Sequence, residues 1–127
     1  MTGLRTLEDA PVVLDELGLK VADPGLLASA IARPAATVFG ADAYPELAGK
    51  VAALLESVVR NHALVDGNKP AGWALAVVTV WLNDQELGYD EDEAFAMVMR
   101  VADGTSTLAK ITEWFASRAS TRQSPAD

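Results

Sequence analysis

The chain has 127 residues, half of them hydrophobic, a formal net charge of −8 and no cysteine. These values predict one domain spanning residues 1–127, exclude a disulfide framework and thiolate metal sites, and argue against direct binding to nucleic acid, which needs clustered Lys and Arg. Because no apolar run reaches about 18 residues and the segment MTGLRTLEDAP lacks a signal-peptide core, we expect a cytoplasmic protein that does not insert into a membrane.

Two helices are expected in the first third of the chain. Residues 7–19 show apolar positions at helical spacing, and Gly18 ends that segment. In the next segment Asp23 can cap a helix, Pro24 suits the first helical position, and Pro34 ends the helix. The pattern of proline and glycine therefore separates two short helices.

The middle of the chain predicts two longer helices. The third begins near Pro45 and runs toward residue 62, with apolar residues at intervals of three and four that form one buried stripe: Leu47, Val51, Leu54, Leu55, Val58 and Val59. The fourth lies in residues 71–85, which are apolar almost all round from Trp73 to Leu82. The run VVTV also suits a strand, but about 15 residues without a turn signal favour a buried central helix.

Two more helices are expected in the last third. Asp90 and Glu93 have nearly the spacing of a capping box, and Gly104 ends the helix that they begin. The final helix is amphipathic, and the tail from residue 121 onward is polar and expected to fray. The apolar side of the final helix consists of Leu108, Ile111, Trp114 and Phe115.

The segment NHALVDGNKPAGW, residues 61–73, interrupts this helical pattern with chemically active side chains. His62, the single histidine of the chain, can accept a proton from a hydroxyl as a general base. Asp66 can hold Mg²⁺, Gly67 allows a turn, and the Asn68 amide and the Lys69 ammonium can bind phosphate oxygens. These are the groups needed to move a phosphorus-containing group from a nucleotide to a hydroxyl.

The same segment also has a purely structural interpretation, which the spacing alone leaves open. A lone histidine before a loop often only ends a helix, and DGN is a common turn sequence. In that interpretation Asn68 is simply the N-cap of the next helix.

The sequence HALVDGNK closely resembles the signature of the Fic/Doc superfamily, and specifically its Doc (death-on-curing) branch. The resemblance extends from about residue 20 to residue 117, which includes the segments before and after the signature. It implies an all-α fold, a compact bundle of about six helices in which the motif loop leads into a buried central helix. Leu64 stands where the family often has phenylalanine, a residue that anchors the loop in the core.

The resemblance also implies an activity. Doc toxins use ATP to phosphorylate elongation factor Tu and so arrest translation. By position, His62 is expected to activate the acceptor hydroxyl, Asp66 to hold Mg²⁺, and Gly67, Asn68 and Lys69 to bind the phosphates of ATP. No Ser or Thr stands four residues before a Glu followed by Gly or Asn, which is the pattern of the family's built-in inhibitory helix. We therefore expect inhibition in trans by a Phd-type antitoxin.

The sequence departs from the signature at Pro70, where the family has an arginine that contacts the nucleotide phosphates. Arg60, Arg33 and Arg100 are the candidates to replace that arginine. Three functions stay open: a Doc-type kinase toxin with a replacement cation or weakened activity, a catalytically degenerate protein that only binds an antitoxin or other partner, and a Fic-type AMP transferase. Lys69 argues against the last, because AMP-transferring members usually have glycine there.

Overall fold

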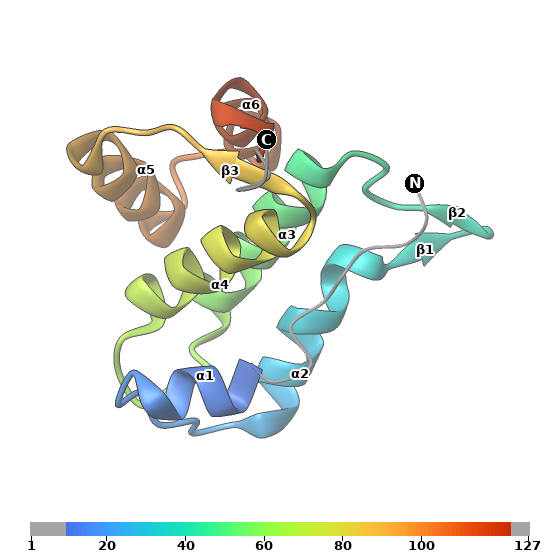
Figure 1. The fold of residues 1–127 in the computed structure, drawn as a ribbon. Helices are drawn as coiled ribbons and strands as arrows, with labels where there is room; N and C mark the ends of the chain where they lie inside the picture. Colours follow the sequence, from blue (N-terminus) through green and yellow to red (C-terminus); the bar gives the residue numbers. More distant parts are fainter. Residues whose placement is uncertain (1–9, 123–127) are drawn as a thin grey trace.

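A computed structural model describes residues 10–122, and six α-helices dominate that part of the chain (Figure 1). The expected bundle of about six helices is therefore confirmed, whereas the expectations for residues 7–9 and 123–127 fall outside the described residues. A short 3-10 helix, η1 (Arg33–Ala35), follows the second helix. The helices are α1 (Ala10–Glu16), α2 (Pro24–Ala32), α3 (Leu47–Asn61), α4 (Asn68–Leu82), α5 (Glu91–Asp103) and α6 (Leu108–Arg118).

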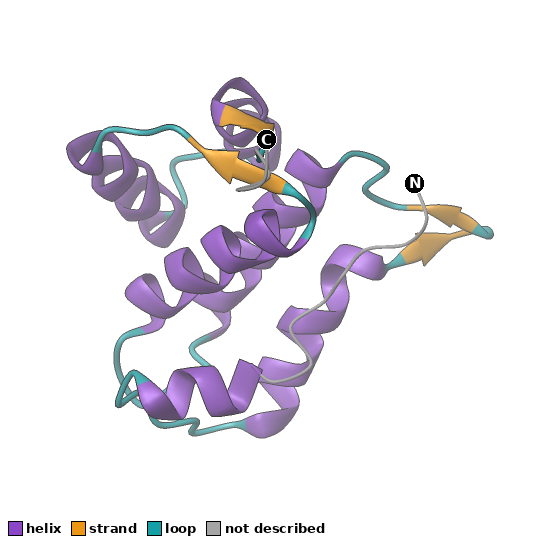
Figure 2. Cartoon of the chain, in the orientation of Figure 1, coloured by secondary structure: helices purple, strands orange, loops and turns teal. Residues whose placement is uncertain are grey.

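Two small antiparallel strand pairs accompany the helices, and the sequence pattern did not predict them (Figure 2). β1 (Thr37–Val38) pairs with β2 (Ala41–Asp42), and β3 (Gln85–Leu87) pairs with β4 (Ala119–Thr121). Strands of two or three residues are too short to show a period of two in the sequence. The expectation that the tail frays from residue 121 is wrong at its first residue, which belongs to β4.

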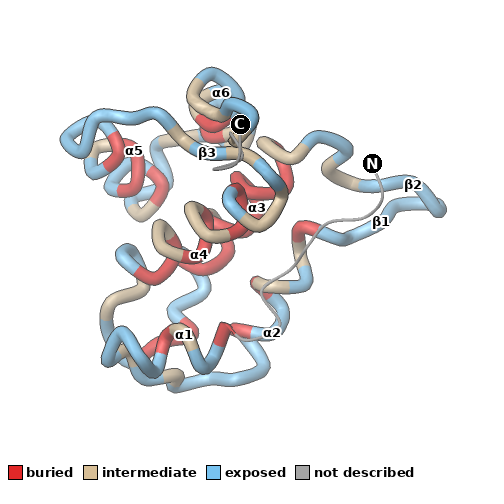
Figure 3. The backbone as a smooth tube through the Cα atoms, viewed as in Figure 1, coloured by how far each residue is buried: buried red, intermediate tan, exposed pale blue. Residues whose placement is uncertain are grey.

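The two longest helices, α3 and α4, lie side by side at the centre of the molecule, and buried residues line the sides that face each other (Figure 3). Gly72 permits their close approach. A Cβ atom at that position would lie 2.7 Å from Val59 Cγ2 and 3.2 Å from Leu55 Cδ1. Contacts of this kind leave no room for a larger side chain. α4 is thus the buried central helix that the sequence predicts.

The remaining helices cover the central pair from two sides. α1 and α2 contribute Leu14 and Leu27 to one buried cluster, which also includes Leu64 of the loop between α3 and α4. α5 and α6 contribute residues such as Met97 and Phe115 to a second cluster. The loop between α3 and α4 is therefore anchored in the first cluster. α5 belongs to the second cluster and lies across from this loop.

The helix ends follow the expected chemistry with one difference. Asp23 caps α2 by accepting from the Leu26 amide at 3.1 Å, and Gly104 ends α5 with a φ of 79°. Asp90 caps α5 by accepting from the amide of Glu93 at 3.2 Å. The Glu93 side chain does not return to complete a capping box, because it forms an ion pair with Arg118 on α6. None of the described helices is long and apolar enough to cross a membrane.

Candidate functional site

The polar segment connects the C-terminal end of α3 to the N-terminal end of α4. His62 is the residue that ends α3, in the left-handed conformation with φ 54° and ψ 44°, and its side chain is exposed. α4 begins at Asn68, and its first backbone hydrogen bond runs from the Ala71 amide to the Gly67 carbonyl at 3.0 Å. Gly67, rather than Asn68, is therefore the N-cap, and the interpretation of Asn68 as the capping residue is wrong.

The segment between α1 and α2 holds this loop in place through the backbone. The carbonyl of Ala63 accepts from the amides of Ala22 and Asp23 at 2.8 and 2.9 Å. The Val65 amide donates to the carbonyl of Lys20 at 2.9 Å. These bonds fix the loop against a neighbouring segment that is distant in sequence, so its shape does not depend on the loop's own residues alone.

A second restraint comes from the side chain of Asn68. Its Oδ1 accepts from the Leu64 amide at 3.0 Å, and its Nδ2 donates to the Leu64 carbonyl at 3.3 Å. Leu64 is buried, at 3% exposure, and packs in the same cluster as α1 and α2. Leucine thus anchors the loop as expected. Both ends of the Asn68 side-chain amide are thus engaged in shaping the loop.

Gly67 is required by both its backbone conformation and its surroundings. Its φ is 77°, which residues with a Cβ atom adopt at a cost, and a Cβ here would lie 2.6 Å from Leu19 Cδ2. The Gly67 amide donates to Asp66 Oδ1 at 2.8 Å. Since that bond occupies one carboxylate oxygen, Asp66 keeps its second oxygen for another partner.

The five residues that the sequence singles out lie around one cavity of about 840 Å³. The structure brings together His62, Asp66, Gly67, Asn68 and Lys69 in its lining. The facing wall comes from α5, which sequence reasoning did not assign to the site. That wall consists of Phe95, Met99, Ala102 and Asp103.

The cavity is lined by charged groups of both signs. Its lining contains two carboxylates, Asp66 and Asp103, and one ammonium, Lys69. Hydrogen bonds from the side chain and the backbone of Thr105 lower the pKa of Asp103, so this carboxylate is ionised at neutral pH. The described residues contain no cluster of three or more carboxylate, imidazole or thiolate ligands. Mg²⁺ ordinarily binds one or two carboxylates together with phosphate oxygens and water, so the two carboxylates of this lining are enough for it.

Pro70 is the third residue of α4 and lies on the rim of the cavity. It precedes Ala71, whose amide makes the first hydrogen bond of the helix, so proline costs the helix no bond at this position. Proline in place of the signature's arginine is therefore structurally neutral. It removes only the positive charge and the hydrogen-bond donors of the arginine side chain.

The three candidate arginines do not line the cavity. Arg33 is engaged elsewhere: it forms an ion pair with Glu56 at 2.8 Å and donates a hydrogen bond to Tyr44. Burial lowers the pKa of Arg33, but these two partners raise it by more, so its pKa lies above the ordinary value. Arg60 lies nearer, donating to the Val101 carbonyl at 3.3 Å beside Gly104 at the end of α5. Arg100 is exposed on α5. Lys69 is thus the one cationic side chain in the described lining.

Two comparisons with known proteins match large parts of this chain. A sequence model of the Fic/DOC family matches residues 5–80, which include the complete segment from His62 to Pro70. A protein of Mycolicibacterium smegmatis named Toxin Doc is 48% identical over 107 residues. That alignment covers 83% of this chain and 82% of the relative. The similarity therefore extends over most of both proteins and is not confined to the motif.

Proposed function

Because the chain belongs to the Fic/DOC family, we propose that it is a toxin of a toxin–antitoxin pair that transfers a phosphoryl group from ATP to a protein hydroxyl. The expected acceptor is a threonine of elongation factor Tu, whose modification arrests translation. One observation carries this proposal: His62, Asp66 and Lys69 line a single cavity at the N-terminal end of α4. A base, a metal ligand and a cation are thereby available to one nucleotide.

In the proposed reaction His62 accepts the proton of the acceptor hydroxyl. The hydroxyl oxygen forms a bond to the γ-phosphorus, the bond from that phosphorus to the bridging oxygen breaks, and ADP leaves with the electron pair. His62 suits this role because its side chain is exposed and lines the cavity, where a protein substrate can approach it. Its position at the end of α3 places it in the same cavity lining as the proposed phosphate-binding residues.

The first turn of α4 provides the proposed phosphate site. Backbone amides at a helix N-terminus have no partner within the helix, and the helix dipole places partial positive charge there. Lys69 adds a full charge at the same point. Asp66 would hold Mg²⁺, which neutralises phosphate charge when it is bound. With two carboxylates in the lining, the cavity is expected to accept ATP as its magnesium complex.

We propose that neutralisation occurs in trans, by a Phd-type antitoxin. The chain lacks the inhibitory sequence pattern found in self-inhibited family members. The proposed test is coexpression with the product of a neighbouring antitoxin gene, which should restore growth. Recovery of growth in cells that produce the toxin without a second protein would contradict it.

A second function is favoured by one observation, the absence of arginine from the described lining of the cavity. In that alternative the fold is kept, and the protein only binds an antitoxin or another partner. Removing one well-placed transition-state donor costs on the order of a hundred- to a thousandfold in rate in other enzymes. A loss of that size would leave a protein that binds nucleotide but transfers almost nothing.

Labelled ATP distinguishes these functions. The purified chain is incubated with Mg²⁺, elongation factor Tu and ATP labelled at either the γ- or the α-phosphate. Label from the γ-position alone supports the kinase, whereas label from the α-position shows AMP transfer instead. If neither label is transferred by the wild-type chain or by Pro70→Arg, the binding function replaces the proposal.

A further inference from the structure

A smaller cavity, of about 260 Å³, adjoins the motif cavity on the side of the connection between α1 and α2. The two cavities share three lining residues of the motif loop: Val65, Asp66 and Gly67. The rest of the smaller cavity's lining comes from the connection: Gly18, Leu19 and Lys20. A second lysine therefore stands beside the carboxylate and the glycine of the proposed phosphate site. Sequence reasoning did not assign this lysine to the site.

The backbone turns the Lys20 side chain away from the core. Val21 and Leu64 form an isolated antiparallel bridge, and the next amide, that of Val65, donates to the Lys20 carbonyl at 2.9 Å. Residues opposite each other in such a pair share a face, and neighbours along each strand alternate between faces. Val21 and Leu64 pack in the core. Lys20 therefore lies on the outer face together with Val65, which is 70% exposed and lines both cavities.

Pro70 and the α1–α2 connection lie on two sides of the same glycine. A Cβ atom at Gly67 would lie 2.6 Å from Leu19 Cδ2 and 3.7 Å from Pro70 Cγ. A charge that position 70 does not provide can therefore be provided from residue 20. The Lys20 side chain is exposed, and within residues 10–122 it forms no ion pair or hydrogen bond, so its ammonium is available to a ligand.

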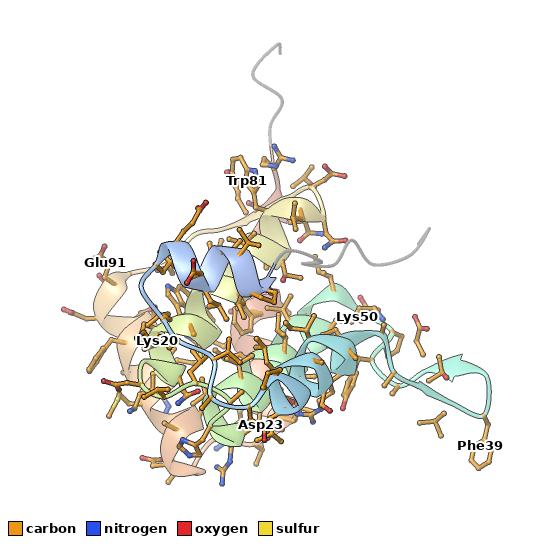
Figure 4. The ribbon with its side chains drawn as sticks, turned by 90° about the horizontal axis from the view of Figure 1, so that it is seen from below. Lys20, Asp23, Phe39, Lys50, Trp81 and Glu91 are labelled. Atoms are coloured by element: carbon orange, nitrogen blue, oxygen red, sulfur yellow. The ribbon has the colours of Figure 1, made fainter. Side chains whose placement is uncertain are left out.

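The other lysines outside the motif are not placed to do this. Lys50 is 3% exposed and pairs with Asp42 at 3.2 Å. Lys110 is exposed on α6 and lines neither cavity. Lys20 lies on the side of the molecule that carries Glu91 of α5, whereas Lys50 lies toward the β1–β2 hairpin (Figure 4). α5 also forms the facing wall of the motif cavity, so Lys20 is on the side where a ligand would bind.

We infer that Lys20 binds the phosphates of ATP and provides part of the positive charge that Pro70 does not. The inference rests on the proposed function, because the nucleotide is the one that the motif cavity would hold. The lining of that cavity contains two carboxylates and one ammonium, and ATP keeps a net negative charge when it carries Mg²⁺. A second ammonium beside Asp66 lowers the electrostatic cost of bringing these charges together.

A lysine replaces only some properties of the arginine. Its ammonium is a point charge on a flexible stem, whereas a guanidinium is a rigid fork that binds two phosphate oxygens at once. Lys20 therefore increases the affinity for the phosphates but does not reproduce the oriented contact of an arginine at position 70. Affinity for the nucleotide and the rate of transfer are thus expected to depend on different residues.

Calorimetric titration of the full chain tests this inference with two probes in excess Mg²⁺, ATP and inorganic tripolyphosphate. The informative variant is Lys20→Met. The matched control is Lys110→Met, which removes the same charge from an exposed position outside both cavities. A third variant, Lys20→Arg, keeps the charge. Lys20→Met is also measured in the Pro70→Arg background, where the arginine would provide the charge.

Lys20→Met should weaken the binding of both probes by about three- to tenfold, between the effect of an exposed ion pair and that of a charged hydrogen bond. Lys110→Met and Lys20→Arg should bind both probes within about twofold of the wild type. In the Pro70→Arg background the loss caused by Lys20→Met should fall below about twofold, because the two cations then act on the same phosphates.

Three results overturn the role of Lys20 and preserve the proposed function: equal binding by Lys20→Met and Lys110→Met, a loss confined to ATP, or a loss that is as large in the Pro70→Arg background. A Lys20→Arg variant that binds as weakly as Lys20→Met also overturns it, because the charge would then not be the cause. If the wild-type chain binds neither probe, the proposed function fails together with this inference.

Discussion

The side chain of Asn68 is bonded at both its oxygen and its nitrogen to the backbone of Leu64, at 3.0 and 3.3 Å. This pair of bonds closes the motif loop on itself immediately before α4. It links a residue expected to bind phosphate to the residue that anchors the loop in the core. The shape of the proposed phosphate site and the stability of the fold therefore depend on the same side chain.

Replacement of Asn68 by alanine should lower the free energy of unfolding by about 1–3 kcal/mol, because it leaves buried polar groups of Leu64 without partners. Urea denaturation measures the change. Asn61→Ala is the control, since Asn61 is exposed at the end of α3. Equal stability of the two variants would show that the two bonds contribute nothing to the loop.

Gly67→Ala should destabilise the protein more than Gly18→Ala. Both glycines have a φ of 77°, but a Cβ at Gly67 meets Leu19, whereas nothing lies within 4 Å of one at Gly18. The shared conformational cost cancels in the comparison, and the remaining difference of about 1–3 kcal/mol reports the steric contact. Leu19→Ala should recover part of that difference in the double variant. A difference near zero contradicts the packing described for the loop.

Pro70→Arg should raise the rate of phosphoryl transfer by on the order of a hundred- to a thousandfold without altering stability. The position is exposed and precedes the first hydrogen bond of α4, so an arginine is sterically acceptable there. Initial rates with γ-labelled ATP measure the effect. Pro70→Ala is the control, because it removes the ring without adding a charge. If both variants behave alike, the charge at this position does not limit the reaction.

Thr105→Val should raise the pKa of Asp103 toward the ordinary aspartate value. Thr105 donates to Asp103 Oδ1 from its hydroxyl at 2.6 Å and from its amide at 2.9 Å, and the substitution removes the first of these bonds. Because the pKa is lower in the folded state, the stabilisation is complete at neutral pH and is lost as the pH falls through the folded value. The stability difference between the two proteins should therefore shrink below about pH 4. An NMR titration that finds the same pKa in both proteins would contradict this assignment.

The sequence was sufficient for features that depend on local chemistry. Asp23 and Pro24 predict the start of α2, and Gly104 predicts the end of α5, because caps act within a few residues. The expected site residues around the loop also lie together, since they are close in the sequence. The family resemblance and the helical periodicity led to the same architecture.

Features that depend on tertiary packing were missed. α5 contributes Asp103 and Phe95 to the site from more than 25 residues away, and no periodicity reveals which face of a helix will meet a distant loop. The β3–β4 pair joins residues 85–87 to residues 119–121, which only the packing of α6 brings together. Trp81 belongs to the helix that the sequence predicts to be buried, but it is half exposed, with the Arg122 guanidinium over its ring.

The role of Asn68 illustrates the same limit at shorter range. Its position before a helix correctly suggested a structural use, but the choice between capping and bonding the preceding loop depends on where the helix begins. α4 begins one residue earlier than a capping Asn68 requires, because Gly67 adopts the left-handed conformation. The backbone of a glycine thus decided the role of its neighbour.

The central claim is that His62 serves as the base for transfer from a nucleotide held at the start of α4. The most direct measurement compares γ-label transfer to elongation factor Tu by Pro70→Arg and by the double variant Pro70→Arg/His62→Ala, with both variants shown to bind ATP equally. The account predicts transfer by the first protein and its loss in the second. Equal transfer by both proteins would contradict it.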